Sequence, residues 1–370
     1  MSSLTRKIRV LVVDDSVVMR RLLSEVIASD PELEVAGYAA NGQIALALFD
    51  QVCPDIVTLD VEMPVMNGME TLKAMRAARR MLPVIMFSTL TERGAEATID
   101  ALALGASDYV AKPTESGYNS GRERIRGALL PRIKALCQRW QRSPGLPPPL
   151  VPRLPSIRHP RLAERIQVVA IGCSTGGPNA LAQVLPDIPA DFPVPLLIVQ
   201  HMPPAFTRFL AQRLSAQCQM EVAEAGDGEI LERGRMWVAP GGYHLEVLRR
   251  GQDVRLHVHQ QAPENSCRPS VDVLFRSVAQ IFSGQALAVV LTGMGQDGLR
   301  GCELLAQQGA EIVVQDEPTS VVWGMPGFVA KAGLARAVLP ISEIASHIVR
   351  RVTAFRPLTS ALVRPMGAAS

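Results

Sequence analysis

Short apolar runs alternate with helical patterns along the first 140 residues of the chain. The apolar runs predict strands at Ile8–Val13, Val35–Ala39, Ile56–Leu59, Val84–Phe87 and Tyr109–Val110. Apolar positions at helical spacing begin near Val17, Gly42, Gly68 and Arg93, and a last helix is expected from about Glu123 to Trp140. Because strands that alternate with helices form a parallel sheet covered on both faces, we expect an α/β domain of the flavodoxin-like (βα)5 type.

The second half of the chain repeats this alternation with one interruption. Strands are expected near 167–171, 195–200, 288–292 and 311–315, with helical segments between them. Polar and apolar residues alternate through 235–260, as in Arg255-Leu-His-Val-His259, which predicts one or two antiparallel hairpins. The expected fold of this half is therefore a doubly wound, mainly parallel α/β sheet with an inserted antiparallel hairpin.

A proline-rich stretch separates the two halves, with seven prolines between residues 144 and 160. Proline has no backbone N–H and a fixed φ, so such a run favours extended polyproline II and is typical of a semi-stiff linker. We therefore expect one domain at 1–140, a linker at 141–165, a second domain at 166–350 and a loose C-terminal tail at 351–370.

The composition narrows the class of protein. A chain of 370 residues that is 48% hydrophobic and 20% charged is long enough for two soluble globular domains. A net charge of +3 is too small to indicate a nucleic-acid or anionic-membrane partner. The six cysteines form no C-x-x-C pair and show no metal-ligand spacing, which favours reduced thiols. With no signal-peptide pattern and no apolar run of about 18 residues, we expect a cytoplasmic monomer that does not insert into a membrane.

Polar side chains follow four of the predicted strands of the first half. Asp14 and Asp15 end the first strand, Asp60 the third and Ser88 the fourth, while the fifth runs on to Lys112. In an open parallel sheet these positions meet at one edge. Three carboxylates together repel one another unless a cation lies among them, and oxygen ligands of this kind suit Mg²⁺. A lysine and a hydroxyl opposite them fit the oxygens of a phosphoryl group on Asp60.

These aspartates also have a simpler interpretation, because aspartate often caps the helix that follows it. One aspartate fits that role, whereas four matched strand ends with a lysine favour a phosphorylation site. The segments that carry this pattern resemble a two-component receiver domain: Val12-Val-Asp-Asp-Ser16, Leu59-Asp-Val-Glu-Met-Pro64, Asn67-Gly68 and Tyr109-Val-Ala-Lys-Pro113. The resemblance implies that a histidine kinase phosphorylates Asp60 and that the three aspartates hold Mg²⁺. It also implies that Ser88 and Tyr109 are switch positions and that Lys112 pairs with the phosphate.

A glycine-rich turn opens the second half. Gly172-Cys-Ser-Thr-Gly176 lies between the apolar run Val168–Ile171 and a helix that begins near Pro178. This is the G-x-S-x-G pattern of a sharp strand-to-helix turn, in which glycines leave room around an exposed Ser174 nucleophile. The helix N-terminus supplies N–H groups where an oxyanion develops. The turn by itself fits a phosphate-binding loop equally well.

A serine nucleophile needs a base, and the base needs a carboxylate to orient it. His201 follows the second predicted strand of this half, so we expect it at the same sheet edge as Ser174. The glycine-rich loop after the third such strand brings Asp297 to that edge as well. The free N–H groups near Met294 in this loop are candidate oxyanion donors.

Other candidate groups have simpler interpretations, with one exception. His347 lies on an apolar C-terminal helix, where a packed core histidine is common, and Cys173 is expected to point into the core. His257 and His259 share one face at strand spacing, but the sequence offers no third metal ligand near them, so solvated hairpin histidines are favoured. His244 remains a rival base.

The order serine, histidine, aspartate differs from that of the α/β-hydrolases, so the turn does not assign this half to that fold. Across 166–345 the sequence resembles instead the catalytic domain of the chemotaxis protein-glutamate methylesterases. The matching segments are Gly172-Cys-Ser-Thr-Gly-Gly177, Gln200-His-Met-Pro203, Ala239-Pro-Gly-Gly242, Arg268-Pro-Ser-Val-Asp-Val273, Leu291-Thr-Gly-Met-Gly295, Asp297-Gly298 and Trp323-Gly-Met-Pro-Gly327. We expect the unusual Cys267 beside one of these segments to bear on substrate fit and not on the chemistry.

The resemblance implies that Ser174, His201 and Asp297 form a catalytic triad, with the backbone N–H groups of Thr175 and Met294 as the oxyanion hole. It implies hydrolysis of glutamate γ-methyl esters on the cytoplasmic domains of chemoreceptors, with release of methanol, and deamidation of receptor glutamines. No cofactor is expected in this half, and phosphorylation of the receiver is expected to uncover the active-site edge. The alternative is a response regulator whose second domain only binds a partner or a ligand.

Overall fold

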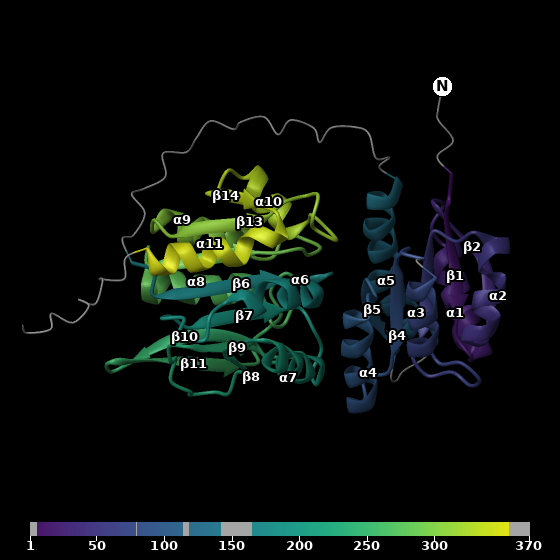
Figure 1. Cartoon of the computed structure of the whole chain (residues 1–370), viewed down its shortest axis with the longest axis horizontal. Helices are drawn as coiled ribbons and strands as arrows, with labels where there is room; N and C mark the ends of the chain where they lie inside the picture. The colour runs from purple at the N-terminus through teal and green to yellow at the C-terminus, as the bar shows by residue number, and fades with distance from the viewer. Residues whose placement is uncertain (1–5, 79, 114–117, 142–164, 355–370) are drawn as a thin grey trace, which may run out of the picture.

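The computed structural model describes residues 6–78, 80–113, 118–141 and 165–354 of the chain. These residues form two α/β units, shown in Figure 1, one before and one after residues 142–164. The predicted linker and tail fall mostly on 142–164 and 355–370, outside the described residues. Within the described ranges, no helix is long and apolar enough to cross a bilayer.

The first unit is a five-stranded parallel sheet with strand order β2-β1-β3-β4-β5. Its strands are β1 (Ile8–Val13), β2 (Leu33–Ala39), β3 (Ile56–Asp60), β4 (Val84–Ser88) and β5 (Asp108–Ala111). Its helices are α1 (Val17–Ala28), α2 (Gly42–Val52), α3 (Gly68–Ala77), α4 (Glu92–Ala103) and α5 (Tyr118–Gln141). The flavodoxin-like (βα)5 prediction is therefore confirmed. The last helix begins at Tyr118, earlier than the predicted start near Glu123. The prediction missed its first turn, Tyr-Asn-Ser-Gly, because that turn has no apolar stripe that marks a helix.

Side-chain caps fix the starts of the helices in this unit. Ser16, Asn41 and Thr91 each accept a hydrogen bond from the backbone N–H three residues later. Asn67 and Glu70 form a reciprocal capping box at the start of α3. Such caps satisfy N–H groups that a helix leaves unpaired and contribute about 1 kcal/mol each. Because β1 lies beside β3, the residues that follow these two strands meet at one edge of the sheet.

The second unit is a seven-stranded parallel sheet with strand order β14-β13-β12-β6-β7-β9-β8. Its strands are β6 (Val168–Cys173), β7 (Leu196–Gln200), β8 (Glu221–Glu224), β9 (Arg235–Val238), β12 (Ala286–Val290), β13 (Glu311–Gln315) and β14 (Ala337–Leu339). Its helices are α6 (Gly177–Val184), α7 (Phe206–Gln217), α8 (Val271–Phe282), α9 (Leu299–Gln307), α10 (Met325–Lys331) and α11 (Ile341–Thr353), with a short 3-10 helix at Leu185–Asp187. The prediction of a doubly wound, mainly parallel sheet is confirmed. Helix α11 continues past residue 350, where the tail was expected to begin.

A separate antiparallel hairpin, β10 (His244–Arg250) and β11 (Asp253–His259), accompanies this sheet. The prediction of antiparallel structure from residue 235 onward was wrong at its start, because β9 pairs in parallel with β7 and β8. Met236, Trp237 and Val238 in β9 are all buried. A strand buried on both faces belongs in the covered parallel sheet, so β9 joins that sheet and not the hairpin.

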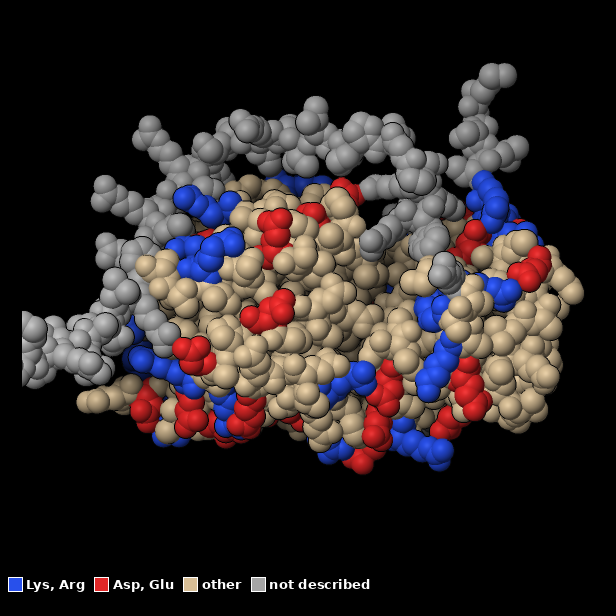
Figure 2. All heavy atoms as spheres, in the orientation of Figure 1, with Lys and Arg blue, Asp and Glu red and all other residues tan. Residues whose placement is uncertain are grey.

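The two units contact each other through α4 of the first and α6 and α7 of the second (Figure 1). Tyr109 in β5 stacks on Phe206, the first residue of α7, with ring centroids 4.9 Å apart. Arg213 on α7 forms an ion pair with Asp100 on α4. Figure 2 shows acidic and basic side chains together at the lower border between the units. Exposed ion pairs contribute only about 0–1 kcal/mol, so the buried aromatic stack is the stronger part of this contact.

Candidate functional site

The turn after β6 holds Ser174 at the carboxyl edge of the second sheet. The N–H of Ser174 donates to the Thr292 carbonyl (3.0 Å), and its own carbonyl accepts from the Gly177 N–H (2.8 Å). Gly176 has a φ of 77°, and a Cβ at this position would lie 2.6 Å from Val321. Glycine is required there both by the left-handed backbone and by the neighbouring side chain. The turn therefore fixes the serine backbone against the loop after β12.

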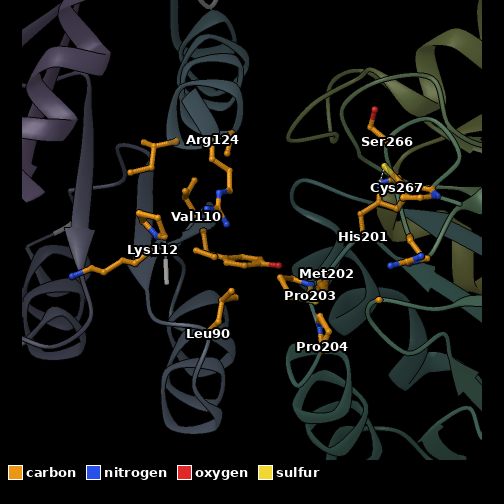
Figure 3. A pocket seen from close by; sticks show the side chains of 18 of the residues that line it. Leu90, Val110, Lys112, Arg124, His201, Met202, Pro203, Pro204, Ser266 and Cys267 are labelled. Carbon is orange, nitrogen blue, oxygen red and sulfur yellow. Dashed lines mark hydrogen bonds between the residues drawn. The ribbon is translucent and has the colours of Figure 1, made fainter. Parts of the chain in front are cut away.

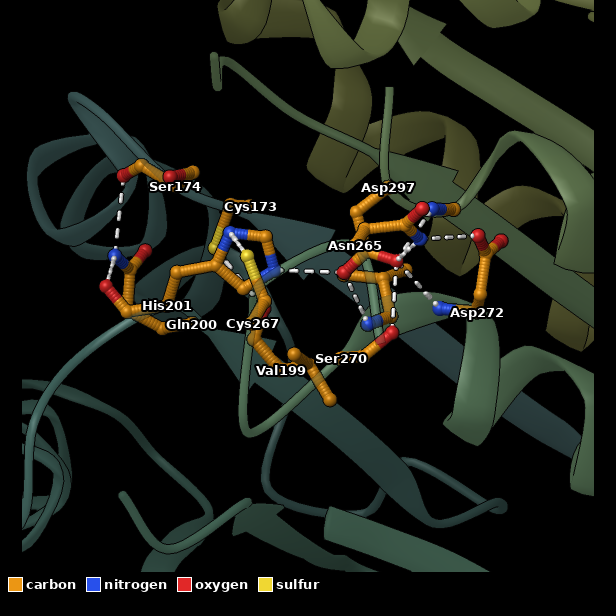
Figure 4. A network of polar contacts seen from close by, with 12 residues as sticks. Cys173, Ser174, Val199, Gln200, His201, Asn265, Cys267, Ser270, Asp272 and Asp297 are labelled. Carbon is orange, nitrogen blue, oxygen red and sulfur yellow. Dashed lines mark hydrogen bonds and ion pairs between the residues drawn. The ribbon is translucent and has the colours of Figure 1, made fainter. Parts of the chain in front are cut away.

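The strand order brings His201 and Asp297 to this turn. His201 follows β7 and Asp297 lies in the loop after β12, so the two residues come from the two sides of β6. His201 Nε2 lies 2.8 Å from Asp297 Oδ2 (Figure 4). The side chains are 12% and 3% exposed, respectively. A buried carboxylate in this position orients the imidazole and stabilises its protonated form.

Asp297 is held at the N-terminus of α8. Its carboxylate accepts from the Ser270 hydroxyl (2.8 Å), the Asn265 amide (2.9 Å) and the backbone N–H groups of Val271 (2.7 Å) and Asp272 (3.1 Å). The partial positive charge of the helix N-terminus also favours an anion here. Burial alone would raise the pKa of Asp297, but the imidazole and these donors hold it well below its ordinary value. Asp297 is therefore ionised at neutral pH.

The second ring nitrogen of His201 faces Cys267. Nδ1 lies 3.6 Å from Cys267 Sγ, and the Ser174 hydroxyl makes no hydrogen bond with any residue that the structure describes. Burial lowers the pKa of His201, but the bond with Asp297 and the neighbouring thiol raise it to about 9. Because Cys267 touches the candidate base itself, the expectation that it bears only on substrate fit does not hold.

The backbone N–H groups of Thr175, in the serine turn, and of Met294, in the loop beside it, have no partner in the described part of the chain. A Cβ on Gly293 would lie 3.0 Å from the Cβ of Ser174, so the loop before Met294 passes directly against the turn. This loop is fixed because the Gly293 carbonyl accepts from the Met325 N–H (2.8 Å). Donors held in place before a reaction are suited to a developing oxyanion.

Two rival groups are excluded by their surroundings. His244 is buried, with Nε2 3.1 Å from the Ala262 carbonyl and Nδ1 accepting from the Ser270 N–H at 3.2 Å. Burial also lowers the pKa of His244, so it is a neutral structural residue with both ring nitrogens occupied. Cys173 is buried as predicted, and burial raises the pKa of its thiol, which makes it unreactive.

A second polar cluster lies at the carboxyl edge of the first sheet. Lys112 Nζ lies 3.0 Å from Asp14 Oδ2 and 2.6 Å from Asp60 Oδ2. Asp14 and Asp60 are buried and Asp15 is exposed, and ligand oxygens of the three lie within 4.8 Å of one another. Burial raises the pKa of Asp60 to about 6, although Lys112 opposes this shift. A set of carboxylate oxygens with buried members is a donor set that fits Mg²⁺.

Ser88 and Tyr109 are at this edge but do not bond to Asp60. The buried Ser88 hydroxyl donates to the Gly94 carbonyl at the start of α4 (2.9 Å). The ring of Tyr109 is turned to the second unit, where it stacks on Phe206. The structure therefore brings Lys112, but neither Ser88 nor Tyr109, into contact with Asp60.

A cavity of about 470 Å³ lies between the two units (Figure 3). His201, Met202 and Cys267 line it from the second unit, and Tyr109 and Arg124 line it from the first. In Figure 3 Arg124 of the first unit lies across the opening from His201 and Cys267 of the second. The first unit therefore stands in front of the candidate base of the second.

Comparisons with known proteins match both units. The response regulator receiver domain family matches residues 10–118, and the CheB methylesterase family matches residues 169–348. The crystal structure of the Thermotoga maritima CheB methylesterase catalytic domain is 38% identical and covers 50% of this chain and 98% of its own, with a TM-score of 0.49. A protein-glutamate methylesterase/protein-glutamine glutaminase of Trichodesmium erythraeum is 50% identical over 351 residues, which cover 94% of this chain and 99% of that protein. One of Nocardioides sp. is 49% identical, with coverages of 95% and 97%. This chain belongs to the protein-glutamate methylesterase/protein-glutamine glutaminase family.

In this member of the methylesterase family, sequence reasoning missed the residues that support the candidate site. Ser270 stands directly before α8, where serine is a common N-cap, yet it bonds to Asp297 and not to the helix. Asn265 lies in a loop that no pattern marks. Gln200 was noted only as part of a matching segment, but its amide donates to the Ser174 carbonyl (3.1 Å) and so supports the turn.

Proposed function

We propose that this chain is a protein-glutamate methylesterase that is activated by phosphorylation of its receiver. Its substrates would be glutamate γ-methyl esters on the cytoplasmic domains of chemoreceptors, and it would also deamidate receptor glutamines. The observation that carries the proposal is the 2.8 Å contact between His201 and the ionised Asp297 beside the Ser174 turn. The names of the two relatives described above, protein-glutamate methylesterase/protein-glutamine glutaminase, support the choice of a glutamate methyl ester or a glutamine as substrate.

In the proposed acylation step, His201 takes the hydroxyl proton of Ser174 as Ser174 Oγ attacks the ester carbonyl carbon. The carbonyl oxygen becomes an oxyanion that accepts from the N–H groups of Thr175 and Met294. The tetrahedral intermediate then expels the methoxy group, which takes the proton from His201 and leaves as methanol. Asp297 stays ionised throughout and stabilises the imidazolium.

In the deacylation step, His201 takes a proton from water, and the resulting hydroxide attacks the acyl-enzyme. Collapse of the second intermediate returns the proton to Ser174 Oγ and releases a free glutamate side chain. A receptor glutamine follows the same route with ammonia as the leaving group. One arrangement of residues therefore serves both activities that the relatives' names carry.

The proposed mechanism requires a Ser174–His201 hydrogen bond that is absent from the contacts described above. The thiol of Cys267 holds Nδ1 of His201, and the first unit stands over the cavity that His201 lines. Catalytic hydrogen bonds are often loose before substrate binds and tighten only in the substrate complex. We expect this bond to form when the receiver moves away and the substrate enters.

Asp60 is the proposed phosphorylation site, and Asp14, Asp15 and Asp60 are the residues that would hold Mg²⁺. Bound Mg²⁺ supplies positive charge that neutralises the phosphoryl oxygens during transfer. Lys112 already lies 2.6 Å from the Asp60 carboxylate, so it can pair with a phosphoryl oxygen on that residue.

The proposed link between the two sites runs through the contact of the units. A phosphoryl group on Asp60 would offer the Ser88 hydroxyl a stronger acceptor than the Gly94 carbonyl. A change at this edge reaches Tyr109, whose stack on Phe206 lies between the units. Loosening of that stack would open the cavity that His201 lines.

We place the receiver domain at 1–140, the linker at 141–165 and the catalytic domain from 166 to the end of α11 at Thr353. The phosphodonor would be a chemotaxis histidine kinase, and the enzyme would act as a monomer. A cytoplasmic setting suits the six free thiols.

A methanol-release assay on methylated receptor fragments tests the function. Ser174→Ala should lower the rate by about 10⁴-fold or more while phosphorylation of the receiver persists. Ser266→Ala, which changes a serine that lines the cavity beside His201, should retain activity. A serine-directed phosphonate should label Ser174 of the wild type, which separates an esterase from a response regulator whose second domain only binds. Full activity of Ser174→Ala would overturn the proposal.

A further inference from the structure

The β10–β11 hairpin gathers potential metal ligands away from both sites described above. Side chains two residues apart on a strand share a face, so His257 and His259 lie on one face of β11. In the register of the hairpin, Glu246 is directly opposite His257. Sequence spacing offered no third ligand here, because Glu246 comes from the neighbouring strand and only the pairing brings it close.

The distances in this cluster fit a small tetrahedral metal ion. Ligand atoms of Glu246, His257 and His259 all lie within 4.8 Å of one another. His259 Nε2 is buried, makes no hydrogen bond, and lies 3.3 Å from Glu246 Oε2. Two ligands that are each about 2.0–2.1 Å from a tetrahedral zinc ion are about 3.3 Å apart. The buried nitrogen and the carboxylate are therefore already spaced as two ligands of one ion.

The surroundings of His257 resemble the outer shell of a metal site. Its Nδ1 lies 3.1 Å from Asp227 Oδ1, and Asp227 is itself held by the N–H of Val258 (2.9 Å). A histidine that binds a metal commonly donates its other ring N–H to a carboxylate, which fixes the ring and leaves Nε2 for the ion. His244 is opposite His259, but both its nitrogens are occupied, so it closes one side of the cluster without being a ligand.

We propose that Glu246, His257 and His259 form a Zn²⁺ site with water as the fourth ligand. Two imidazole nitrogens and one carboxylate favour zinc over Mg²⁺ or Ca²⁺, which prefer oxygen ligands throughout. His259 is the last residue of β11 and leads into the loop that carries Asn265 and Cys267 to the catalytic edge. Bound zinc fixes the start of that loop and stabilises the folded chain.

Two other clusters of the described residues must be kept apart from this one in any metal titration. A large excess of Mg²⁺ in the titration occupies the site that the three receiver aspartates would form. The group of His201, Cys267 and Asp297 also has its ligand atoms within 4.8 Å. The Asp297 oxygens there already accept from Ser270 and from the backbone N–H groups at the start of α8, and Cys267→Ser removes the sulfur ligand.

The test is calorimetric titration of the untagged full chain with ZnCl₂, in excess Mg²⁺ and on the Cys267→Ser background. We expect one zinc per chain, and His257→Gln or His259→Gln should weaken binding by at least about tenfold, as should Glu246→Gln. Arg255→Gln changes a residue on the same face of β11 that is not a ligand, so its zinc affinity should be unchanged. Circular dichroism confirms that each variant is folded.

Anomalous diffraction at the zinc edge then locates the ion. The expected result is one peak bonded to His257, His259 and Glu246, together with a rise in melting temperature on adding zinc that His257→Gln lacks. The proposal is overturned if the peak lies elsewhere, if no zinc binds, or if the histidine variants bind zinc as tightly as Arg255→Gln.

Discussion

Cys267 Sγ lies 3.6 Å from Nδ1 of His201, which is the ring nitrogen left to accept a proton from a serine nucleophile. The two residues are 66 positions apart in the chain and meet only because the loop after β11 folds over the end of β7. The thiol raises the pKa of His201 and contacts the ring nitrogen that is not bonded to Asp297. Cys267 therefore influences both the protonation and the direction of the proposed base.

Replacing this thiol should shift the pH dependence of catalysis. The base must be neutral, and the pKa of His201 is about 9, so kcat/KM for methanol release should rise with pH towards that value. Cys267→Ala removes a contribution that raises this pKa, so the midpoint should move to lower pH and the rate at neutral pH should increase. Cys218→Ala, whose thiol is at the end of α7, is the control. An unchanged midpoint in Cys267→Ala would show that the thiol does not act on His201.

The His201–Asp297 pair should also make stability depend on pH. The folded pKa of His201 is raised from 6.5 to about 9, so protonation favours the folded state. This contribution is fully present below about pH 6.5 and is lost as the pH rises through about 9. The difference in free energy of unfolding between the wild type and His201→Gln should therefore shrink over this range. Urea denaturation at several pH values measures it, and a constant difference would contradict the assignment.

Changes at Asp297 and at one of its hydrogen-bond donors should separate two roles. The carboxylate orients His201, and the donor holds the carboxylate in place. Asp297→Asn should lower kcat/KM by about 10⁴-fold, because an amide neither fixes the tautomer of His201 nor stabilises its cation. Ser270→Ala removes only one donor to Asp297 and should cost about 1.5–3 kcal/mol in the free energy of unfolding, with a smaller loss of activity. Methanol release and urea denaturation of both variants give the comparison. Equal losses of activity in the two would exclude a distinct role for the carboxylate.

Asp60→Asn should abolish activation without abolishing catalysis. The amide cannot be phosphorylated, so methanol release should not respond to acetyl phosphate with Mg²⁺, while the basal rate stays measurable. Asp50→Asn, which changes an exposed aspartate on α2, should respond like the wild type. A full response of Asp60→Asn to the phosphodonor would place the phosphorylation site elsewhere.

The sequence predicted the parts of both sites that follow from counting strands. Asp14 and Asp60 stand at the ends of β1 and β3, and His201 stands at the end of β7. In a parallel sheet such residues meet at one edge whatever the side chains around them, so their convergence needed only the strand assignments.

The parts that sequence reasoning missed depend on side-chain packing between distant segments. Asn265 reaches Asp297 from a loop with no regular pattern, and Cys267 contacts the second ring nitrogen of His201. Glu246 joins the hairpin histidines through strand pairing, and Tyr109 meets Phe206 only because two separate units pack together. None of these contacts has a periodicity or spacing that a single sequence displays.

The clamping of Asp297 by the start of α8 has a kinetic consequence. A carboxylate held by the backbone and by two side chains cannot follow the imidazole, so alignment with Ser174 is left to side-chain rotations of the histidine and the serine. Such rotations are orders of magnitude faster than the relative motion of two domains, which takes about microseconds to milliseconds. We therefore expect the proposed departure of the receiver, which is the slower motion, to set how often the site opens, so that changes at the boundary between the units alter the rate independently of the chemical groups.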